Sequence, residues 1–265
     1  MKLPIALTIA GSDSGGGAGI QADLKTFAAL GCHGTSAITA ITVQNTLGVR
    51  EALALAPALV RAQIDAIADD VPPRAAKTGM LSSPAIIEAV AEAVRERRLD
   101  PLVVDPVMIA KGGHRLLQEE AIATLREQLL PLALVVTPNL PEAEVLLGHP
   151  VATRSEREQA ARELTALGCG AAIVKGGHAE ADADDVLFDG DHLIWLPGER
   201  LDARNTHGSG CVFSAAIAAG LARGLALYPA VREAKRFITG AIRHSLELGG
   251  GHGPVNPMWE RRVPG

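Results

Sequence analysis

The chain has 265 residues, of which 48% are hydrophobic and only 3% aromatic, and its formal net charge is −5. This acidic balance and the scarcity of aromatic side chains argue against a nucleic-acid-binding surface, which needs basic patches and stacking rings. Three widely separated cysteines exclude a disulfide framework and a cysteine-type zinc site. Neither a signal peptide nor a membrane span is predicted, so we expect one cytoplasmic domain over residues 1–265.

Short β-type segments alternate with longer helical ones along the chain. The predicted strands are Ile5–Ala10, Ser36–Val43, Ala75–Thr78, Leu102–Asp105, Leu134–Thr137 and Ala171–Lys175, followed by a hairpin of Asp185–Phe188 and His192–Leu196. The predicted helices are Ile20–Leu30, Pro57–Asp69, Pro84–Arg97, Glu119–Gln128, Ser155–Leu167 with Glu158 in a capping box, Cys211–Arg223 and Tyr228–Leu248. This alternation predicts an α/β fold with a mostly parallel central sheet and helices on both faces.

Polar residues and glycines follow each of the first six predicted strands. These segments are Gly11–Gly19, Gln44-Asn45, Gly79-Met80, Asp105–Met108, Pro138–Glu142 and Lys175–His178. Because ligands of open parallel sheets bind outside the carboxyl ends of the strands, we expect the six segments to form one cleft.

The glycine-rich loop after the first strand does not match the two best-known phosphate-binding motifs. A Walker loop needs lysine after glycine, and no lysine in the chain follows a glycine. The dinucleotide fingerprint fails because Ile20 occupies its third glycine position. A hydride-transfer enzyme is therefore disfavoured. Asp13 and Asp23 flank the loop and have the default interpretation of turn or helix caps.

A second glycine-rich segment, Gly208-Ser209-Gly210-Cys211, runs directly into a predicted helix. The first turn of a helix has unpaired N–H groups and the positive end of the macrodipole, so this segment predicts a cradle for an oxyanion or phosphate. The same position is expected to lower the pKa of the Cys211 thiol. An ordinary loop-to-helix turn with a buried cysteine is the alternative.

Charged residues at the strand exits suggest magnesium and phosphate chemistry. Asp105 and Glu142 are candidate ligands, because Mg²⁺ takes one or two carboxylates and completes its shell with water and phosphates. Their alternatives are a turn acid and a helix cap, and Lys175 is either a phosphate contact or a solvated lysine. His178 and His207 lack metal-ligand spacing and are expected to be hydrogen-bonding loop residues.

Taken together, these segments resemble the hydroxymethylpyrimidine and phosphomethylpyrimidine kinases of thiamine biosynthesis, within the ribokinase-like superfamily. The matching stretches are Ala10–Leu30, Ala37–Thr46, Lys77–Leu81, Asp105–Met108, Thr137–Glu142, Lys175–His178, Asn205–Ala216 and Gly251–Asn256. The resemblance spans essentially the whole chain, and it implies a ribokinase-like fold and a homodimer. It departs in detail at Ser209, where the family more often has threonine.

The resemblance implies phosphorylation of 4-amino-5-hydroxymethyl-2-methylpyrimidine, and then of its monophosphate, by ATP with Mg²⁺. The residues that it assigns to the pyrimidine pocket are Gly11, Asp23, Gln44, Met80 and Val107. The residues that it assigns to the anion hole and catalysis are Gly208, Ser209, Gly210 and Cys211. Those on the metal and nucleotide side are Asp105 and Glu142 for magnesium, and Asn139, Lys175, Thr206 and Lys235 for the nucleotide.

Cys211 stands where sugar kinases of the superfamily carry an aspartate, so a thiolate of lowered pKa is expected to act as the general base. A pyridoxine or pyridoxal kinase is the nearest alternative function, and Gln44 and Met80 favour the pyrimidine. A catalytically silent nucleotide- or pyrimidine-binding protein is an alternative from another class. The intact segments at Gly208–Cys211 and Lys175–His178 argue against it, because a binding protein needs no phosphoryl anion hole.

Overall fold

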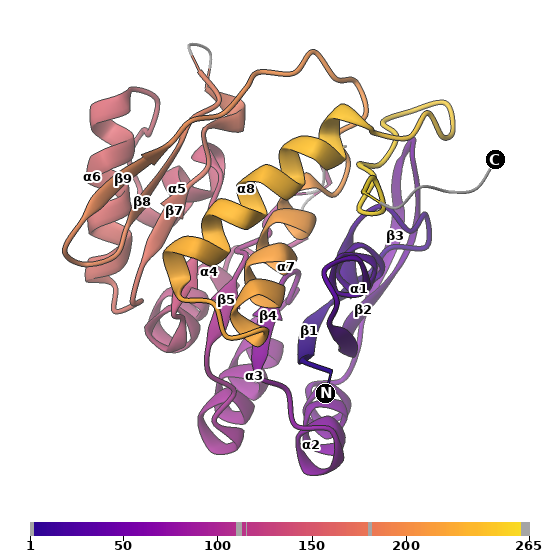
Figure 1. Ribbon diagram of the computed structural model, residues 1–265. Coiled ribbons are helices and arrows are strands. Elements are labelled where there is room, and N and C mark those ends of the chain that lie inside the picture. Colours follow the sequence, from indigo (N-terminus) through magenta and orange to yellow (C-terminus); the bar gives the residue numbers. More distant parts are fainter. Residues whose placement is uncertain (1–2, 110–112, 115, 180–181, 261–265) are drawn as a thin grey trace.

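The computed structural model describes residues 3–109, 113–114, 116–179 and 182–260, and the chain forms a nine-stranded sheet (Figure 1). The strands are β1 (Ile5–Ser12), β2 (His33–Asn45), β3 (Gly48–Ala54), β4 (Ala75–Thr78), β5 (Leu102–Val104), β6 (Val135–Val136), β7 (Ala172–Val174), β8 (Asp185–Phe188) and β9 (Leu193–Leu196). Their order across the sheet is β3-β2-β1-β4-β5-β6-β7-β8-β9. From β2 to β7 neighbouring strands run parallel, whereas β3, β8 and β9 pair antiparallel.

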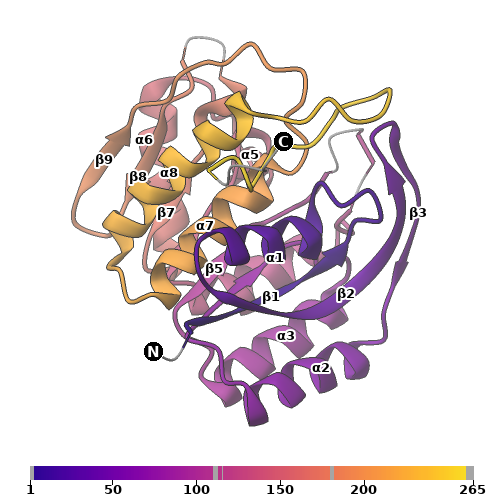
Figure 2. The ribbon, with the colours of Figure 1, turned by 45° about the vertical axis from the view of Figure 1, so that its right-hand side comes forward.

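Helices cover both faces of this sheet. They are α1 (Gly19–Ala29), α2 (Pro57–Asp70), α3 (Pro84–Arg97), α4 (Ala121–Thr124), a π-helix η1 (Leu125–Leu129), 3₁₀ turns η2 (Leu130–Leu132) and η3 (Gly176–His178), α5 (Leu140–Leu147), α6 (Arg154–Ala166), α7 (Ser209–Ala222) and α8 (Leu227–Arg243). Figure 2 shows α1, α7 and α8 on one face and α2 and α3 on the other. The predicted α/β fold with a mostly parallel sheet is confirmed.

Two hydrophobic cores lie on the two sides of the sheet, as the period of a strand dictates. In β1, Leu7 and Ile9 face the core under α2, α3 and α6, while the intervening Ala6 faces the core under α1, α7 and α8. Small side chains let α7 lie close to the sheet, and every residue from 212 to 222 is buried. This close packing brings the start of α7 against the carboxyl edge of the parallel strands. Among the described residues, no helix is long and apolar enough to cross a membrane.

Several predicted elements differ from the structure. The last helix ends at Arg243 and not at Leu248, and the strand β3 and the helix α5 were not predicted. Glu158 is not in a capping box; Thr153 and Glu156 form the box of α6, and Glu158 accepts a hydrogen bond from Trp195 Nε1 at 2.8 Å. The box lies two residues earlier because the helix begins at Arg154, so its cap is Thr153.

Candidate active site

The glycine-rich loop between β1 and α1 is folded around the carboxylate of Asp13. This carboxylate accepts hydrogen bonds from the backbone N–H groups of Gly15 at 2.8 Å, Gly17 at 3.0 Å and Ala18 at 2.8 Å. Burial opposes the charge, but the hydrogen bonds from His207 and from these N–H groups lower the pKa of Asp13 overall. The interpretation of Asp13 as a cap is therefore confirmed, and the loop has a built-in anion at its centre.

The start of α7 meets this loop directly. Gly208 caps the helix with φ +78°, and a Cβ at this position would collide with the carbonyl oxygen of Gly17. Glycine is therefore required at residue 208 both for the left-handed backbone and for the close approach. The first turn, over Ser209, Gly210 and Cys211, lies at the junction of loop and helix, and its Ser209 N–H donates to the carbonyl of Thr206 at 3.2 Å. An anion cradle at this junction stays a prediction.

The Cys211 thiol does not have the lowered pKa expected from its place at a helix start. Burial raises its pKa to about 11, and the carboxylates of Asp23 and Asp105 add to the rise. Lys77 and the backbone N–H of Gly19 act in the opposite direction without overcoming burial. The prediction was wrong because it counted the helix end and omitted desolvation. The thiol is protonated at neutral pH in this environment.

Acidic and basic side chains converge at the ends of β5, β6 and β7. Lys175 Nζ lies 3.1 Å from Asp105 Oδ1 and 4.0 Å from Glu142 Oε2. Asp105 also accepts hydrogen bonds from Thr137 Oγ1 at 3.3 Å and Ser214 Oγ at 3.2 Å. The lysines and hydroxyls offset burial, so the pKa of Asp105 is lowered. The order of the strands thus unites three residues that lie far apart in the sequence.

Glu142 has two roles at the start of α5. It forms a capping box with Asn139, since Glu142 N–H donates to Asn139 Oδ1 at 2.9 Å and Asn139 N–H donates to Glu142 Oε2 at 2.8 Å. Burial raises the pKa of Glu142 to about 7, against the attraction of Lys175. The expected helix cap is confirmed, and the acid still faces the cation of the cluster.

The carboxylates of Asp105 and Glu142 fit a magnesium ion that is held mostly by water and phosphates. Among the described residues there is no group of three His, Cys, Asp or Glu side chains that could hold a metal. Both Asp105 oxygens already accept hydrogen bonds. The donor set therefore suits an ion that arrives with a nucleotide, and not a permanent protein cage.

Asp23 is a buried residue of α1. Its side chain is completely buried, and Oδ2 accepts hydrogen bonds from Thr8 Oγ1 at 2.6 Å and Lys77 Nζ at 2.9 Å. Its Oδ1 has no hydrogen-bond partner among the described residues. The cap interpretation of Asp23 is wrong, because the residue lies inside α1 and forms a buried ion pair. A direct contact between Asp23 and a pyrimidine stays a prediction.

The remaining pocket residues lie around the exits of β1, β2, β4 and β5. A Cβ on Gly11 would stand 2.9 Å from Met80 Sδ, so these two residues are in contact. Val107 lines a small cavity with Thr78, Gly79 and Asp105. Gln44 lies 3.4 Å from His207, which links the end of β2 to the start of α7.

Two of the predicted nucleotide contacts are already engaged within the protein. Lys235 Nζ donates to Asp185 Oδ2 at 2.7 Å and to the carbonyl of Ala183 at 3.1 Å. The other oxygen of Asp185 accepts from Gly176 N–H at 2.9 Å, so Lys235 supports the exit of β7. Thr206 uses its carbonyl to accept from Ser209 N–H at 3.2 Å. Lys235 is thus placed beside the segment that follows Lys175.

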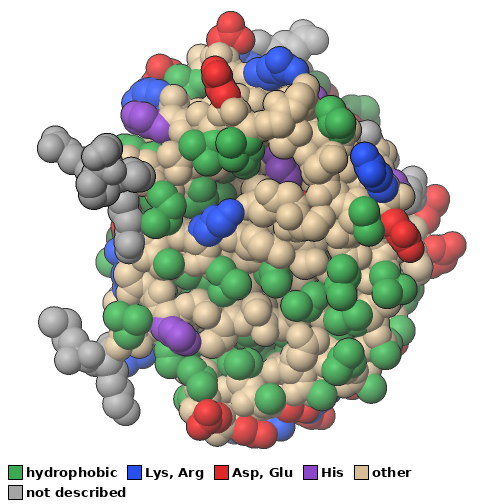
Figure 3. Space-filling view, turned by 90° about the vertical axis from the view of Figure 1, so that its right-hand side faces the viewer, with side chains coloured by type: hydrophobic (Ala, Val, Ile, Leu, Met, Phe, Trp, Pro, Cys, Tyr) green, Lys and Arg blue, Asp and Glu red, His purple; other side chains and the backbone are tan. Residues whose placement is uncertain are grey.

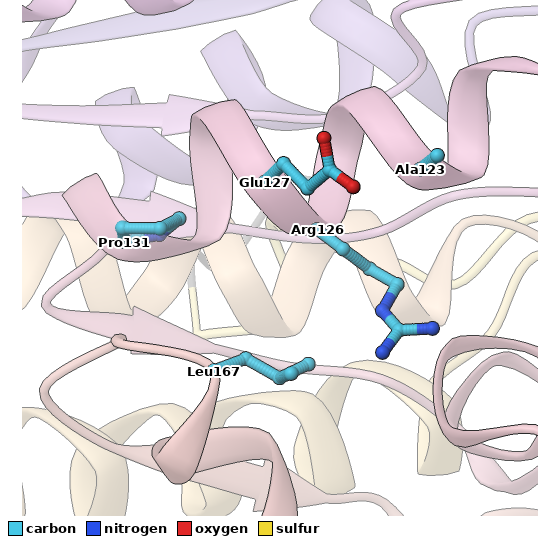
Figure 4. Close-up of a pocket in the computed structure, with 5 residues that line it drawn as sticks. All are labelled: Ala123, Arg126, Glu127, Pro131 and Leu167. Carbon is cyan, nitrogen blue, oxygen red and sulfur yellow. The ribbon is translucent and has the colours of Figure 1, made fainter.

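A larger hollow, of about 440 Å³, lies elsewhere on the molecule (Figure 4). It is lined by Ala123, Arg126, Glu127, Pro131 and Leu167. Pro131 and Leu167 precede β6 and β7, so this hollow is at the amino ends of the strands. It is thus on the opposite edge from the glycine loop and the start of α7.

Lys77 and His207 contact residues of the site, although the sequence indicated no role for Lys77 and only a hydrogen-bonding loop position for His207. Lys77 stood in the quoted segment Lys77–Leu81, but its burial against Asp23 depends on packing between α1 and β4. His207 Nε2 lies 2.9 Å from Asp13 Oδ2, a contact between residues 194 positions apart. No local pattern reveals contacts of this range.

Known proteins share both the sequence and the fold. A sequence model described as "Phosphomethylpyrimidine kinase" matches residues 13–256. A Rhizobium meliloti protein named hydroxymethylpyrimidine/phosphomethylpyrimidine kinase is 52% identical over 95% of this chain and 96% of its own. The chain belongs to the phosphomethylpyrimidine kinase family.

Solved structures agree with this family assignment. A phosphomethylpyrimidine kinase from Clostridium difficile superimposes with a TM-score of 0.81 at 44% identity, covering 91% of this chain and 100% of that one. A pyridoxal kinase from Bacillus subtilis, solved as an ADP complex, gives a TM-score of 0.91 at 42% identity, covering 98% and 99%. The ribokinase-like fold and a kinase activity are therefore confirmed for this member of the family.

Proposed function

We propose that the protein transfers phosphate from ATP to 4-amino-5-hydroxymethyl-2-methylpyrimidine, and then to the monophosphate, to give the diphosphate used for thiamine. The observation that carries the proposal is the junction of the glycine loop with the start of α7, beside Lys175 and two carboxylates. Helix N–H groups and a lysine are the groups that phosphoryl transfer needs, because its transition state spreads negative charge over oxygen atoms.

The residues of the site divide the work. The positive end of α7, over Ser209, Gly210 and Cys211, stabilises the charge on the transferred group, and Lys175 approaches that group from the acidic cluster. Asp105 and Glu142 would hold magnesium, which when bound neutralises charge between the phosphates of ATP. Asn139, Thr206 and Lys235 complete the nucleotide side.

In the pocket for the phosphate-accepting substrate, Gln44 forms hydrogen bonds with the edge of the heterocycle. Gly11, Met80 and Val107 form the apolar walls. A carboxamide offers a donor and an acceptor side by side, which complement the ring nitrogen and the amino group of an aminopyrimidine. Pyridoxal has no such adjacent pair. Gln44 therefore favours the pyrimidine.

Phosphorylation of pyridoxal is a second candidate function. The Bacillus subtilis pyridoxal kinase and this chain share 42% of their residues and nearly the whole fold. A hydroxymethyl group on a small nitrogen heterocycle is the acceptor in both reactions.

An acceptor panel with Mg²⁺-ATP and product identification by mass separates these functions. The panel holds the hydroxymethylpyrimidine, its monophosphate, pyridoxal, pyridoxine and ribose, with Lys175→Met as the inactive control. Conversion of the pyrimidine through the monophosphate to the diphosphate is expected. Turnover of pyridoxal alone would transfer the assignment to vitamin B6 salvage.

We also propose that the protein is a homodimer. Ile41 and Leu53 pair across β2 and β3, and both side chains are about half exposed or more, as is Val43. Figure 3 looks onto this side of the molecule and shows hydrophobic side chains spread over it, with charged ones mostly toward the rim. Covering such a surface is favourable.

Light scattering of Ile41→Lys should then give a monomer mass, whereas wild type and the control Val145→Lys, which alters an exposed side chain of α5, should give a dimer. A monomeric wild type at working concentration would contradict the homodimer.

A further inference from the structure

Two side chains flank the carboxamide of Gln44 at the end of β2. Thr42 Oγ1 lies 3.3 Å from Gln44 Oε1, and His207 Nε2 lies 3.4 Å from Gln44 Nε2. The two neighbours therefore flank opposite ends of the amide. His207 Nε2 is at the same time 2.9 Å from Asp13 Oδ2.

The imidazole of His207 is held firmly in this place. Its backbone N–H donates to the carbonyl of Gly253, and its own carbonyl accepts from Val255 N–H, both at 3.1 Å. A Cβ on Gly17 would collide with the ring, so glycine is needed there to admit it. The ring is 13% exposed. Its position is thus set by elements outside β2.

The hydrogens on His207 Nε2 and Thr42 Oγ1 determine which end of the Gln44 carboxamide faces His207. The ionised carboxylate of Asp13 accepts only, so the hydrogen on His207 Nε2 points to Asp13. That nitrogen then has no lone pair to accept an N–H from Gln44. Thr42 Oγ1 gives its single hydrogen to the carbonyl of Ser12 at 2.8 Å, which leaves it an acceptor.

The contacts are most favourable when the amide nitrogen donates to Thr42 Oγ1 and the amide oxygen faces the N–H of His207, which is directed to Asp13. A half-turn about the Cγ–Cδ bond of Gln44 exchanges the two ends, and this torsion has a broad, two-fold preference. The opposite orientation would set N–H against N–H at one end. In this orientation the carboxamide still has one N–H and one oxygen lone pair, on the side away from Thr42 and His207, for a ligand.

We propose that His207, held by Asp13, is a positioning residue that fixes the Gln44 carboxamide with its oxygen toward α7 and thereby sets which way the acceptor ring lies. The proposal rests on the proposed function. In the aminopyrimidine, the hydroxymethyl group is on the carbon next to the one that carries the amino group. Pairing the amino group with the amide oxygen directs the hydroxymethyl group toward Gly208 and the start of α7, where phosphate is transferred. The opposite amide orientation directs it away.

The 4-oxo analogue of the acceptor tests this orientation, because it exchanges donor and acceptor along the recognised edge. It can satisfy the fixed carboxamide only with its ring turned over, so wild type should bind it as a competitive inhibitor and phosphorylate it poorly. In His207→Phe the carboxamide is free to rotate. The ratio of kcat/KM for the amino over the oxo acceptor should then fall by about tenfold or more, with the KM for ATP unchanged.

Thr42→Val provides a second variant at the other end of the amide, in case His207→Phe does not fold. It should also lower the ratio, whereas Thr42→Ser keeps the acceptor oxygen and the wild-type ratio. His192→Phe, in the exposed β8–β9 hairpin, is the matched histidine control. Parallel losses for both acceptors, with the ratio unchanged in both variants, would show a merely structural role and overturn the proposal. A wild type that phosphorylates neither acceptor, but turns over pyridoxal, would instead defeat the proposed function.

Discussion

Two lysine–aspartate pairs lie at the carboxyl edge of the sheet, and they differ in access to solvent. Lys77 and Asp23 are 2.9 Å apart with both side chains fully buried. Lys175 and Asp105 are 3.1 Å apart, and the Lys175 side chain is 14% exposed. Both side chains of the sealed pair are shielded from solvent, whereas the Lys175 ammonium of the open pair can exchange its partner for a phosphate. The same chemical pair is thus a support in one place and a candidate contact in the other.

The sealed pair is held together by its own charges. Burial opposes the charge of Lys77, but Asp23, Cys211 and Asp105 more than offset it and raise the pKa of the lysine. Its ammonium is therefore a permanent positive charge under the start of α7. Removing either partner leaves the other without compensation.

Lys77→Met should have the largest effect on stability. An unpaired Asp23 in the core is expected to lower the free energy of unfolding by about 3–5 kcal/mol. Urea denaturation followed by circular dichroism measures the loss. The double variant Lys77→Met/Asp23→Leu, which removes both charges, should recover most of it; if it does not, the sealed pair is more than a charge balance.

Lys175→Met, in contrast to Lys77→Met, should affect catalysis more than stability. Loss of a cation at the transferred phosphate is expected to lower kcat by about 10²–10³-fold. The loss in stability should be smaller than for Lys77→Met, because Lys175 is partly solvated. Steady-state kinetics and urea denaturation of the same preparations make the comparison. An unchanged kcat would remove Lys175 from the site.

Glu142, beside the open pair, should make the stability of the protein depend on pH. Its pKa of about 7 lies above the usual value of 4.5, so the folded protein holds a proton that the unfolded chain releases. This contribution to stability is complete below pH 4.5 and is lost as the pH rises to about 7. The loss is on the order of 2–3 kcal/mol. Without magnesium, denaturation at pH 5 and pH 8 should show it in wild type and not in Glu142→Gln.

Cys211 lies near both pairs and should have the smallest effect. Since the thiol pKa is about 11, Cys211→Ala should lower kcat of the first phosphorylation by less than about tenfold, well short of a lost general base. The second phosphorylation needs no base and should not change. Alkylation of Cys211 by iodoacetamide should accelerate up to about pH 11. A hundredfold loss confined to the first step would restore the thiol as the base.

The repeated order of strands and helices was readable from the sequence because it rests on local periodicity. Ala75–Thr78 and Pro84–Arg97 were predicted with the bounds that the structure has. β3 was missed because its side chains are mostly exposed and show no alternation; it is a strand through its pairing with β2. The last helix was predicted too long because its polar continuation carries no stop that a local pattern reveals.

The sequence by itself determined the glycine segments, the strand exits and the family resemblance, since these depend on residue type and spacing. Only the tertiary structure decided what each charge faces. Asp23 became a buried ion pair and Cys211 a protonated thiol, because burial and long-range neighbours set a side chain's charge state. The contact of His207 with Asp13 and Gln44 likewise exists only where β1, β2 and α7 meet. Desolvation and hydrogen bonds between distant segments have no local sequence pattern.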